Sequence, residues 1–299
     1  MPTELDVAVL GQIGRDLVLQ VQEWPEPGGA APAGRRLEML GGKGANQAVG
    51  MAQLGLSVGL VAVVGDDRTG EEVLAAAASD GIDVSSVVRR SSTSTALLLD
   101  LVEEGGHRRL VEDVPEGTLL TPEDIAYLLP SVLAASTVVL QMQQPAESMT
   151  IAARAARAAG RRIVLDGAVP NAELLALADV LRADEEEASS MVDDFEDPVR
   201  AATELQQRHA LELVVLAAGK AGNAVAWPGG QALLPLEDDA VVDQTGAGDA
   251  WIAGLTAGLV RGLNHRAAAE LGASAAERTV QRLGGRPDLT SLLASTRRW

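Results

Sequence analysis

Short apolar runs alternate with segments of helical periodicity along most of the chain. Runs of strand length cover residues 6–10, 58–64, 137–140, 162–166 and 213–217. Apolar residues at helical spacing lie between them, over residues 69–79, 146–159, 171–178, 198–210 and 250–261. Strands that alternate with helices in this way form βα units around a parallel sheet. The pattern therefore predicts an α/β sandwich with a mostly parallel central sheet.

Two stretches break this alternation. Residues 16–39 alternate polar and apolar positions around the insert WPEPGGAAPAG, and residues 95–111 hold two strand-like runs around the sequence EEGG at 103–106. Each stretch predicts a pair of strands without a helix, and the EGG sequence suits a hairpin turn. One interpretation is a small antiparallel element that covers one end of the main sheet as a flap. The other is a pair of ordinary surface excursions, and the pattern alone does not choose between them.

Composition narrows the classes of protein to which the chain can belong. The 299 residues are 47% hydrophobic with a formal net charge of −18. This suits a globular fold and excludes non-specific nucleic-acid binding, which needs a basic surface. The absence of cysteine excludes a disulfide framework. The N-terminal sequence MPTELDVAVL lacks the features of a signal peptide, and no apolar run is long enough to span a bilayer. We expect a cytoplasmic protein with no membrane partner.

The heptapeptide DQTGAGD at residues 243–249 carries the strongest chemical signal. It lies between the strand-like residues 239–242 and an apolar helix that we expect to begin near Ala250. The small residues at 246–248 let successive backbone N–H groups point at one spot, and the helix dipole adds positive potential, so an anion is favoured there. Asp249 would repel a phosphate unless it has a chemical task. The natural task is to accept a proton from a hydroxyl that attacks a phosphoryl group.

A second glycine-rich turn, GGKG at residues 41–44, runs into a helix whose apolar positions include Ala48 and Met51. Glycines let a ligand approach the backbone closely. Lys43 can meet an anion or a hydroxyl, and Asn46 offers a polyol both a donor and an acceptor. The turn is not a Walker A motif, which needs Gly-Lys-Ser or Gly-Lys-Thr after a four-residue gap. The alternative is a helix N-terminus with a surface lysine.

A dinucleotide-binding interpretation of residues 246–248 fails. The fingerprint needs a third glycine at the position that Trp251 occupies. It also needs an acidic residue at the end of a second strand about 20 residues on. A helical pattern continues there instead, over residues 263–270. The glycine-rich turn is therefore not the start of a Rossmann dinucleotide site.

Together these segments resemble the PfkB family of sugar kinases and, within it, the ribokinases. The sequence GGKGANQA matches the family's N-terminal signature, and DQTGAGDAWIAGL matches its C-terminal one. The segments VGDDRTG, QMQQP and GGRP fall where ribokinases have similar segments, at residues 64–70, 141–145 and 284–287. The resemblance covers almost the whole chain, in order.

The resemblance implies a Rossmann-like three-layer α/β/α sandwich with a β-sheet lid. It implies ATP as the phosphoryl donor and the primary hydroxyl of a sugar as the acceptor. A single ribokinase-like domain would span residues 1–299, with lid segments inserted at about residues 16–40 and 94–113. Because the lid of such kinases often forms the subunit interface, a homodimer through the lid is expected.

Roles for individual residues follow from the same resemblance. Asp249 matches the catalytic base, and the N–H groups of the anion hole, which stabilise charge on the transferring phosphoryl group, match Gly246, Ala247, Gly248 and Asp249. Positions that match sugar contacts are Asp16, Gly42, Lys43, Asn46 and Gln143, together with Asp249. The nucleotide is expected at Asp184, Glu187, Gly219, Lys220, Gly222, Gly246 and Gly248. Mg²⁺ is expected at Glu187 through water, and a monovalent cation, K⁺, at Asp243, Thr245, Gly284 and Asp288.

Three positions depart from the family pattern. Ribokinases have Asn at the position of Gly14, Glu at that of Gln143 and Asn at that of Asp184. The first two changes remove groups that would read ribose, since buried hydroxyls need specific partners. The third adds negative charge near the phosphates. Without the resemblance, residues 184–187 would be interpreted as a solvated helix start.

Ribose, phosphorylated to ribose 5-phosphate, is the expected acceptor, but the departures leave other acceptors open. Within the family these include nucleosides, 2-keto-3-deoxygluconate, and fructose or its phosphates. A catalytically silent sugar-binding or regulatory protein on the same scaffold is the remaining alternative. Retention of Asp249 and the whole GAGD turn argues against it.

Overall fold

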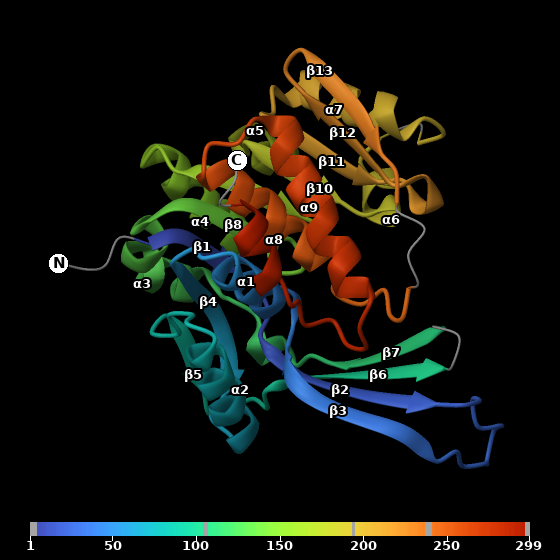
Figure 1. Cartoon of the computed structure of the whole chain (residues 1–299). Coiled ribbons are helices and arrows are strands. Elements are labelled where there is room, and N and C mark those ends of the chain that lie inside the picture. Colours follow the sequence, from blue (N-terminus) through green and yellow to red (C-terminus); the bar gives the residue numbers. More distant parts are fainter. Residues whose placement is uncertain (1–4, 104–106, 193–194, 237–240, 297–299) are drawn as a thin grey trace.

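The computed structural model describes residues 5–103, 107–192, 195–236 and 241–296. Within these residues a nine-stranded main sheet carries helices on both faces (Figure 1). Its strands, in spatial order, are β13 (Gly230–Leu234), β12 (Asn223–Trp227), β11 (Leu213–Ala217), β10 (Val180–Ala183), β9 (Arg162–Asp166), β8 (Ala135–Gln141), β1 (Leu5–Leu10), β4 (Val58–Gly65) and β5 (Val87–Arg90). All neighbours from β11 to β5 pair in parallel, whereas β12 and β13 close one edge antiparallel. The predicted fold class is confirmed.

The helices form two layers that cover the two faces of this sheet. One layer consists of α1 (Lys43–Gln53), α2 (Arg68–Ser79), α8 (Ala247–Val260) and α9 (His265–Val280), whose apolar side chains form one buried cluster with the sheet. The other layer contains α3 (Pro122–Leu133), α4 (Ala146–Ala158), α5 (Ala172–Leu177), α6 (Glu185–Ser189) and α7 (Pro198–His209). The remaining helical segments are α10 (Thr290–Thr296) and two 3₁₀ turns, η1 (Glu116–Thr118) and η2 (Gly219–Ala221).

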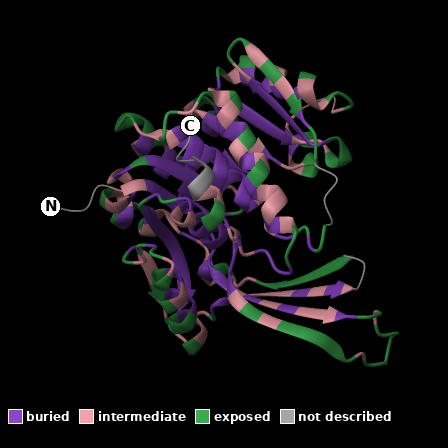
Figure 2. Cartoon of the chain, in the orientation of Figure 1, coloured by how far each residue is buried: buried purple, intermediate pink, exposed green. Residues whose placement is uncertain are grey.

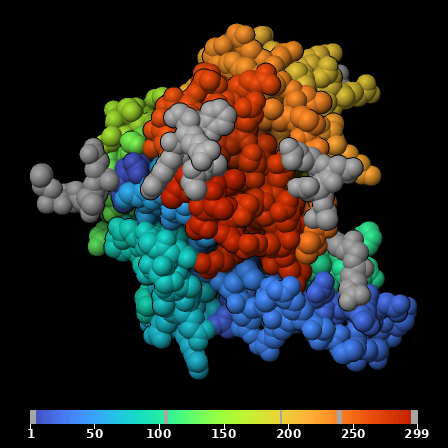
Figure 3. All heavy atoms as spheres, viewed as in Figure 1, coloured from blue at the N-terminus to red at the C-terminus, as the bar shows by residue number. Residues whose placement is uncertain are grey.

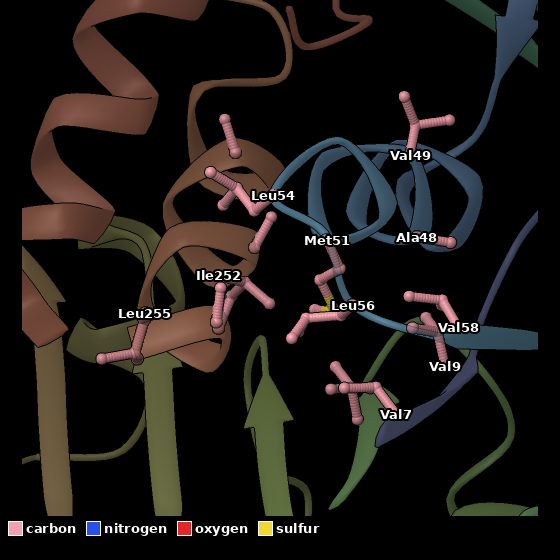
Figure 4. Packing of buried hydrophobic residues seen from close by; sticks show 14 of the residues in the cluster. Val7, Val9, Ala48, Val49, Met51, Leu54, Leu56, Val58, Ile252 and Leu255 are labelled. Atoms are coloured by element: carbon pink, nitrogen blue, oxygen red, sulfur yellow. The ribbon is translucent and has the colours of Figure 1, made fainter. Parts of the chain in front are cut away.

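The alternation of side chains along β1 shows how the sequence specifies both layers. Val7 and Val9 belong to the cluster with α1 and α8, whereas Ala8 and Leu10 belong to the cluster on the opposite face. Figure 4 shows Val7 and Val9 in the first cluster, together with Met51 of α1. A strand covered by helices on both faces must be apolar at every position, as the central parallel strands here are.

Some elements differ from the sequence-based prediction. Helix α8 begins at Ala247, so the expected start near Ala250 is wrong by three residues. The predicted strand at residues 239–242 is wrong in its described part, because Val241 and Val242 have irregular backbone and the Val242 N–H donates to the Val280 carbonyl at 2.8 Å. Residues 239 and 240 lie outside the described residues. Four short strands and two helices were not predicted from the apolar pattern, namely β5, β10, β12, β13, α3 and α10.

The two irregular stretches form a separate four-stranded sheet, so they are not isolated surface excursions. Its order is β3 (Ala33–Gly41), β2 (Gly14–Val21), β6 (Ala96–Glu103) and β7 (Arg108–Asp113). Strands β2 and β6, from the two distant segments, pair in parallel, and β3 and β7 flank them antiparallel. The predicted EGG turn at 104–106 lies outside the described residues. We call this four-stranded sheet the lid sheet.

The lid sheet projects from one end of the main body, as the ribbon and the space-filling view both show (Figures 1 and 3). Its two faces differ. Val18 and Val102 are buried against Leu283, near the end of α9. Figure 2 shows buried and half-buried positions alternating along β2 and β6. One face of the lid sheet therefore meets the body, and the opposite face is open. Among the described helices, none has the length and hydropathy needed to cross a bilayer.

Candidate active site

The N-terminus of α8 forms a tight turn that only glycine can make. Gly246 caps the helix with a φ of 73°, and a Cβ on it would lie 1.9 Å from the carbonyl oxygen of Gly285. The first turn then follows directly, with Ala247, Gly248 and Asp249 in sequence. The first N–H groups of a helix have no intrahelical partner and carry the positive end of the dipole. The free N–H groups of this turn are those that were predicted to bind an anion, and their binding of an anion stays a prediction.

Asp249 is buried, with 7% of its surface exposed. Gln47 Nε2 donates to Asp249 Oδ1 at 3.1 Å and to Asp166 Oδ2 at 2.7 Å, so one amide joins two carboxylates. Burial, followed by the negative charge of Asp166, raises the pKa of Asp249 to about 7, against the opposing effects of Lys43 and Gln47. Such a carboxylate takes up and gives back a proton near neutral pH.

Asp166 and Arg182 extend this cluster on the neighbouring strands β9 and β10. Arg182 Nη1 lies 3.2 Å from Asp166 Oδ1, and both side chains are almost fully buried. Burial alone would lower the pKa of Arg182, but the charges of Asp166 and Glu187 raise it above its usual value. The guanidinium is therefore a positive charge beside Asp249, the carboxylate that was predicted to be the catalytic base.

Helix α1 begins at the second glycine-rich turn. Gly42 has a φ of 89°, and Gly44 packs so closely on β1 that a Cβ would lie 2.7 Å from the backbone of Gly11. These glycines press the start of α1 against the carboxyl end of β1. Lys43 Nζ consequently lies 3.9 Å from Glu187 Oε1, and Asn46 is buried with its Oδ1 lacking a partner among the described residues.

Asp16 lies on the lid strand β2, next to the same turn. Its carboxylate occupies the space that a side chain at Gly41 would fill, because a Cβ there would lie 1.8 Å from Asp16 Oδ1. Burial, with smaller effects from Asp100 and Asp249, raises the pKa of Asp16 to about 7. Its Oδ1 has no hydrogen-bond partner among the described residues. Asp16, Asn46 and Asp249 thus present oxygen acceptors that a polyol could satisfy.

A pocket of about 660 Å³ opens beside α8 and β10. It is lined by most of the residues that were predicted to meet the nucleotide, namely Asp184, Gly219, Lys220, Gly222 and Gly248. Trp251, Ala273 and Val280 add apolar surface to it. A cavity of this size with an apolar wall and a polar floor suits a nucleotide. The phosphate end would lie at the start of α8, near Arg182.

Residues 184–187 form the start of the short helix α6. Asp184 Oδ1 accepts from the N–H of Glu187, and Glu187 Oε2 accepts from the N–H of Asp184, each at 2.8 Å. This is a capping box, so these residues do begin a helix, but Asp184 and Glu187 are half-buried rather than fully solvated. Burial raises the pKa of Glu187. Its Oε1 remains directed toward Lys43, at the floor of the site.

The predicted cation ligands are only partly brought together. Asp243 Oδ1 accepts from the N–H of Thr245 at 2.9 Å and from its hydroxyl at 2.6 Å, and Oδ2 accepts from the N–H of Gly284 at 2.9 Å. Asp288, by contrast, pairs with Arg282 through its carboxylate. Asp243 thus ties the GAGD turn to the segment after α9. Among the described residues there is no cluster of three or more His or carboxylate side chains arranged to hold a metal.

The structure bears on two of the departures from the family pattern. Gly14 lies opposite Ala96 in the β2–β6 pairing, and a Cβ on it would be 2.6 Å from the Ala96 carbonyl oxygen. No larger side chain fits there without moving the two lid strands. Gln143 is exposed in the turn after β8. Gln144, beside it, is buried and accepts from the N–H of Leu120 at 2.9 Å.

Three residues of the site were not predicted from the sequence: Gln47, Asp166 and Arg182. Gln47 lies inside the GGKGANQA signature, where its side chain could have been suspected. Asp166 ends an apolar strand, which is the edge of a parallel sheet where ligands bind. Arg182 lies in a strand too short to be predicted, so nothing local pointed to it.

Comparison with known proteins matches this geometry to a family. The chain fits the description "pfkB family carbohydrate kinase" over residues 4–292. It belongs to the pfkB family of carbohydrate kinases. The kinase is 26% identical to a ribokinase of Haemophilus influenzae, over 95% of this chain and 94% of that protein. It is 31% identical to an ATP-dependent ribose-1-phosphate kinase of Halopiger xanaduensis, over 83% of this chain and 82% of that one.

The fold of this chain is also similar to that of solved structures. The structure of Arabidopsis thaliana ribokinase complexed with ribose and ATP has a TM-score of 0.79 with the kinase, at 25% identity, over 98% of each chain. The kinase is therefore an ATP-dependent sugar kinase with a ribokinase-like fold. The alternative of a catalytically silent binding protein is set aside.

Proposed function

We propose that this kinase transfers the γ-phosphoryl group of ATP to the primary hydroxyl of ribose, giving ribose 5-phosphate. The position of Asp249 carries the proposal: it is a buried carboxylate in the first turn of a helix, with a pKa of about 7. About half of such a base is ionised at pH 7, and the ionised form is basic enough to accept a hydroxyl proton. The sugar oxygen attacks the γ-phosphorus in line, its proton passes to Asp249, and ADP leaves.

The sugar would lie between the lid sheet and the start of α1. Asp16 and Asn46 each keep a buried oxygen without a partner among the described residues. A buried acceptor without a hydrogen bond costs about 1–3 kcal/mol, so a ligand that donates hydroxyl protons is favoured there. The N–H of Gly42 donates a hydrogen bond to Asp16, and the charge of Lys43 acts on Asp249. This arrangement supports a small polyol as the acceptor.

Mg²⁺ would accompany ATP and neutralise part of the phosphate charge. Glu187 fits a water-mediated role, because one of its oxygens is held by the capping box and the other lies near Lys43. Asp184 lines the nucleotide pocket and would add its carboxylate to the same region.

K⁺ would lie near the GAGD turn. The carboxylate of Asp243 already accepts three hydrogen bonds, so its part is to orient the carbonyl groups of Thr245 and Gly284 rather than to supply most of the charge. The carboxylate of Asp288 could bind the cation only if its ion pair with Arg282 were broken. The site as folded fits a weakly bound monovalent ion held mainly by backbone oxygens.

A different acceptor is the second candidate. The side chain that ribokinases carry at position 14 does not fit beside Ala96, and Gln143 is exposed. The relative that is 31% identical is named as acting on ribose 1-phosphate. Lys43 could serve a phosphosugar, and the family alternatives of a nucleoside, 2-keto-3-deoxygluconate or fructose also remain.

An ADP-release assay over pentoses, hexoses, sugar phosphates, nucleosides and sugar acids tests the proposal. Ribose should give the highest kcat/KM, Asp249→Asn should lower turnover by at least about 10³-fold, and K⁺ should raise it. Product analysis should locate the new phosphate on the 5-hydroxyl. A higher kcat/KM for another acceptor would refute ribose but not the kinase chemistry.

The open face of the lid sheet supports a homodimer. The β2–β6–β7 register places leucine and valine side chains on one face, at Leu17, Leu19, Leu97, Leu99, Leu101 and Val111. Val111 is 56% exposed, and the leucines among these residues are half-buried. A contiguous apolar surface of this kind on a sheet is typical of a protein interface. A second copy of the same face is the proposed partner.

A further inference from the structure

Arg182 stands at the edge of the main sheet where parallel strands end. It pairs in register with Asp166 across β10 and β9, and its side chain is only 13% exposed. A buried arginine is uncommon unless its charge is matched. Arg182 is matched by Asp166, yet among the described residues this uses one hydrogen bond of the five that a guanidinium can donate. Arg182 also lines the nucleotide pocket.

The guanidinium of Arg182 lies directly against the anion-binding turn. A Cβ at Gly248 would be 2.6 Å from Nη1 and 2.7 Å from Nη2, which is closer than any side chain allows. The absence of a side chain at Gly248 therefore makes room for the guanidinium as well as for the phosphate. The guanidinium and the N–H groups of the turn would both face an anion bound at the start of α8.

Several carboxylates lie near Arg182, so a bound phosphoryl group at this point would meet their negative charge. Asp166, Glu187 and Asp249 all act on Arg182 electrostatically. Lys43 also brings positive charge to this cluster, and its Nζ lies 3.9 Å from Glu187 Oε1. In the transition state of phosphoryl transfer, negative charge is spread over the three equatorial oxygens of the transferring group. Without a planar cation near Gly248, that charge would lie close to three carboxylates.

We propose that Arg182 is a catalytic residue that binds the transferring phosphoryl group through its guanidinium. The bond from the γ-phosphorus to the bridging oxygen of ADP breaks as the bond to the sugar oxygen forms, and the sugar proton passes to Asp249. Arg182 donates N–H groups to the phosphoryl oxygens during this step and keeps its contact with Asp166. The inference rests on phosphoryl transfer at Asp249 but not on the identity of the sugar.

The test compares binding of a ground state with binding of a transition-state mimic. Isothermal calorimetry gives the affinity of wild type and Arg182→Gln for MgADP alone and for MgADP with aluminium fluoride and the best acceptor of the panel. We expect Arg182→Gln to leave the affinity for MgADP within about threefold and to weaken the fluoride complex about 100-fold, with a similar loss in kcat. Arg182→Lys should recover part of that loss. An unchanged ratio of the two affinities in Arg182→Gln would overturn the proposal.

A purely structural role for Arg182 is tested separately. If Arg182 only neutralised Asp166, the double variant with Asp166→Asn and Arg182→Gln would regain the kcat of Asp166→Asn alone, and that result would overturn the proposal. We expect the double variant to stay about 100-fold slower than Asp166→Asn. Because this pair leaves no unpaired buried charge, it also guards against failure to fold.

Arg162→Gln is the matched control. Arg162 also pairs with a carboxylate at a strand end, Glu212, at 3.1 Å, but at the far end of β9 from Asp166. It should lose stability without changing the ratio of the two affinities. If the wild-type enzyme phosphorylates no sugar, the proposal that ribose is the acceptor is refuted. Slow hydrolysis of ATP then still reports on Arg182, since transfer to water passes through the same phosphoryl charge.

Discussion

The hydrogen bond from Gln47 to Asp249 should set the pH at which this kinase becomes active. Gln47 Nε2 serves both Asp249, at 3.1 Å, and Asp166, at 2.7 Å. Replacing Gln47 with Met keeps the length of the side chain and removes both donations. Asp249 then loses a partner that favours its ionised form, and Asp166 repels it without a bridging dipole. The pKa of Asp249 should therefore rise above its wild-type value of about 7.

The size of the effect follows from the energetics of charged hydrogen bonds. Relative to an exposed aspartate, ionising Asp249 costs about 4 kcal/mol, given its pKa of about 7 against an ordinary 3.8. A hydrogen bond to a charged acceptor contributes about 1.5–3 kcal/mol, and Gln47 divides its donation between two carboxylates. A loss of about 1.4 kcal/mol at Asp249 corresponds to about one pH unit. The rate at pH 6 should fall about tenfold, whereas the rate at pH 9 should change little.

The assay is kcat/KM for the sugar between pH 5.5 and 9.5 at saturating ATP and constant ionic strength. Gln53→Met is the control. Gln53 lies on the same helix and also makes two hydrogen bonds, donating to the Pro287 carbonyl and accepting from the N–H of Leu289. It should lower the melting temperature and leave the pH profile unchanged. If Gln47→Met lowers the rate equally at every pH, the amide acts only by packing and the reasoning is refuted.

Three further outcomes are expected. The pKa of Asp249 is higher in the folded state than in the unfolded state, so ionisation of this group lowers the stability of the fold as pH rises from about 4 through 7. Asp249→Asn should therefore raise the melting temperature more at pH 8 than at pH 5. An equal rise at both pH values would contradict the raised pKa. Gly14→Ala should cost about 1–3 kcal/mol in urea unfolding, because its Cβ would meet the Ala96 carbonyl; an unchanged midpoint would mean that the strands give way freely. Leu99→Arg should convert the dimer to a monomer in sedimentation velocity. Leu233 is an exposed leucine on β13, outside the lid sheet, so Leu233→Arg should leave the dimer intact. A monomeric wild type would exclude the proposed dimer.

The sequence predicted the fold where local patterns repeat. Parallel strands buried on both faces give unbroken apolar runs, and helices that cover them give a period of 3.6, so both layers could be assigned. Gly246 and Gly42 were predicted to lie in glycine-rich turns that a ligand can approach closely, and both have a positive φ, which glycine adopts readily. The start of α8 was placed three residues late, because a glycine-rich turn with helical dihedrals has no apolar residues to mark it.

The site was predictable only in its local parts. Asp249 could be predicted because it directly follows a glycine-rich turn that was expected to bind an anion. Arg182 could not, because its meaning depends on contact with Gly248, which is distant in sequence and comes from a different element. The sequence likewise did not predict the hydrogen bond that the N–H of Gly284 donates to the carboxylate of Asp243, 41 positions away. Such contacts arise from the packing of the whole chain, and a single sequence does not display them.

The bond between Gln47 and Asp249 spans 202 positions of the chain. A protein made from its N-terminus on the ribosome completes α1, with Gln47 already in place, long before α8 has been synthesised. Pairing between such distant segments is slow, because the intervening loop must close before the contact is rewarded. The lid sheet and most of the main sheet can therefore form while the kinase is still incapable of chemistry. Activity should appear as a late event of folding, when the C-terminal helices dock.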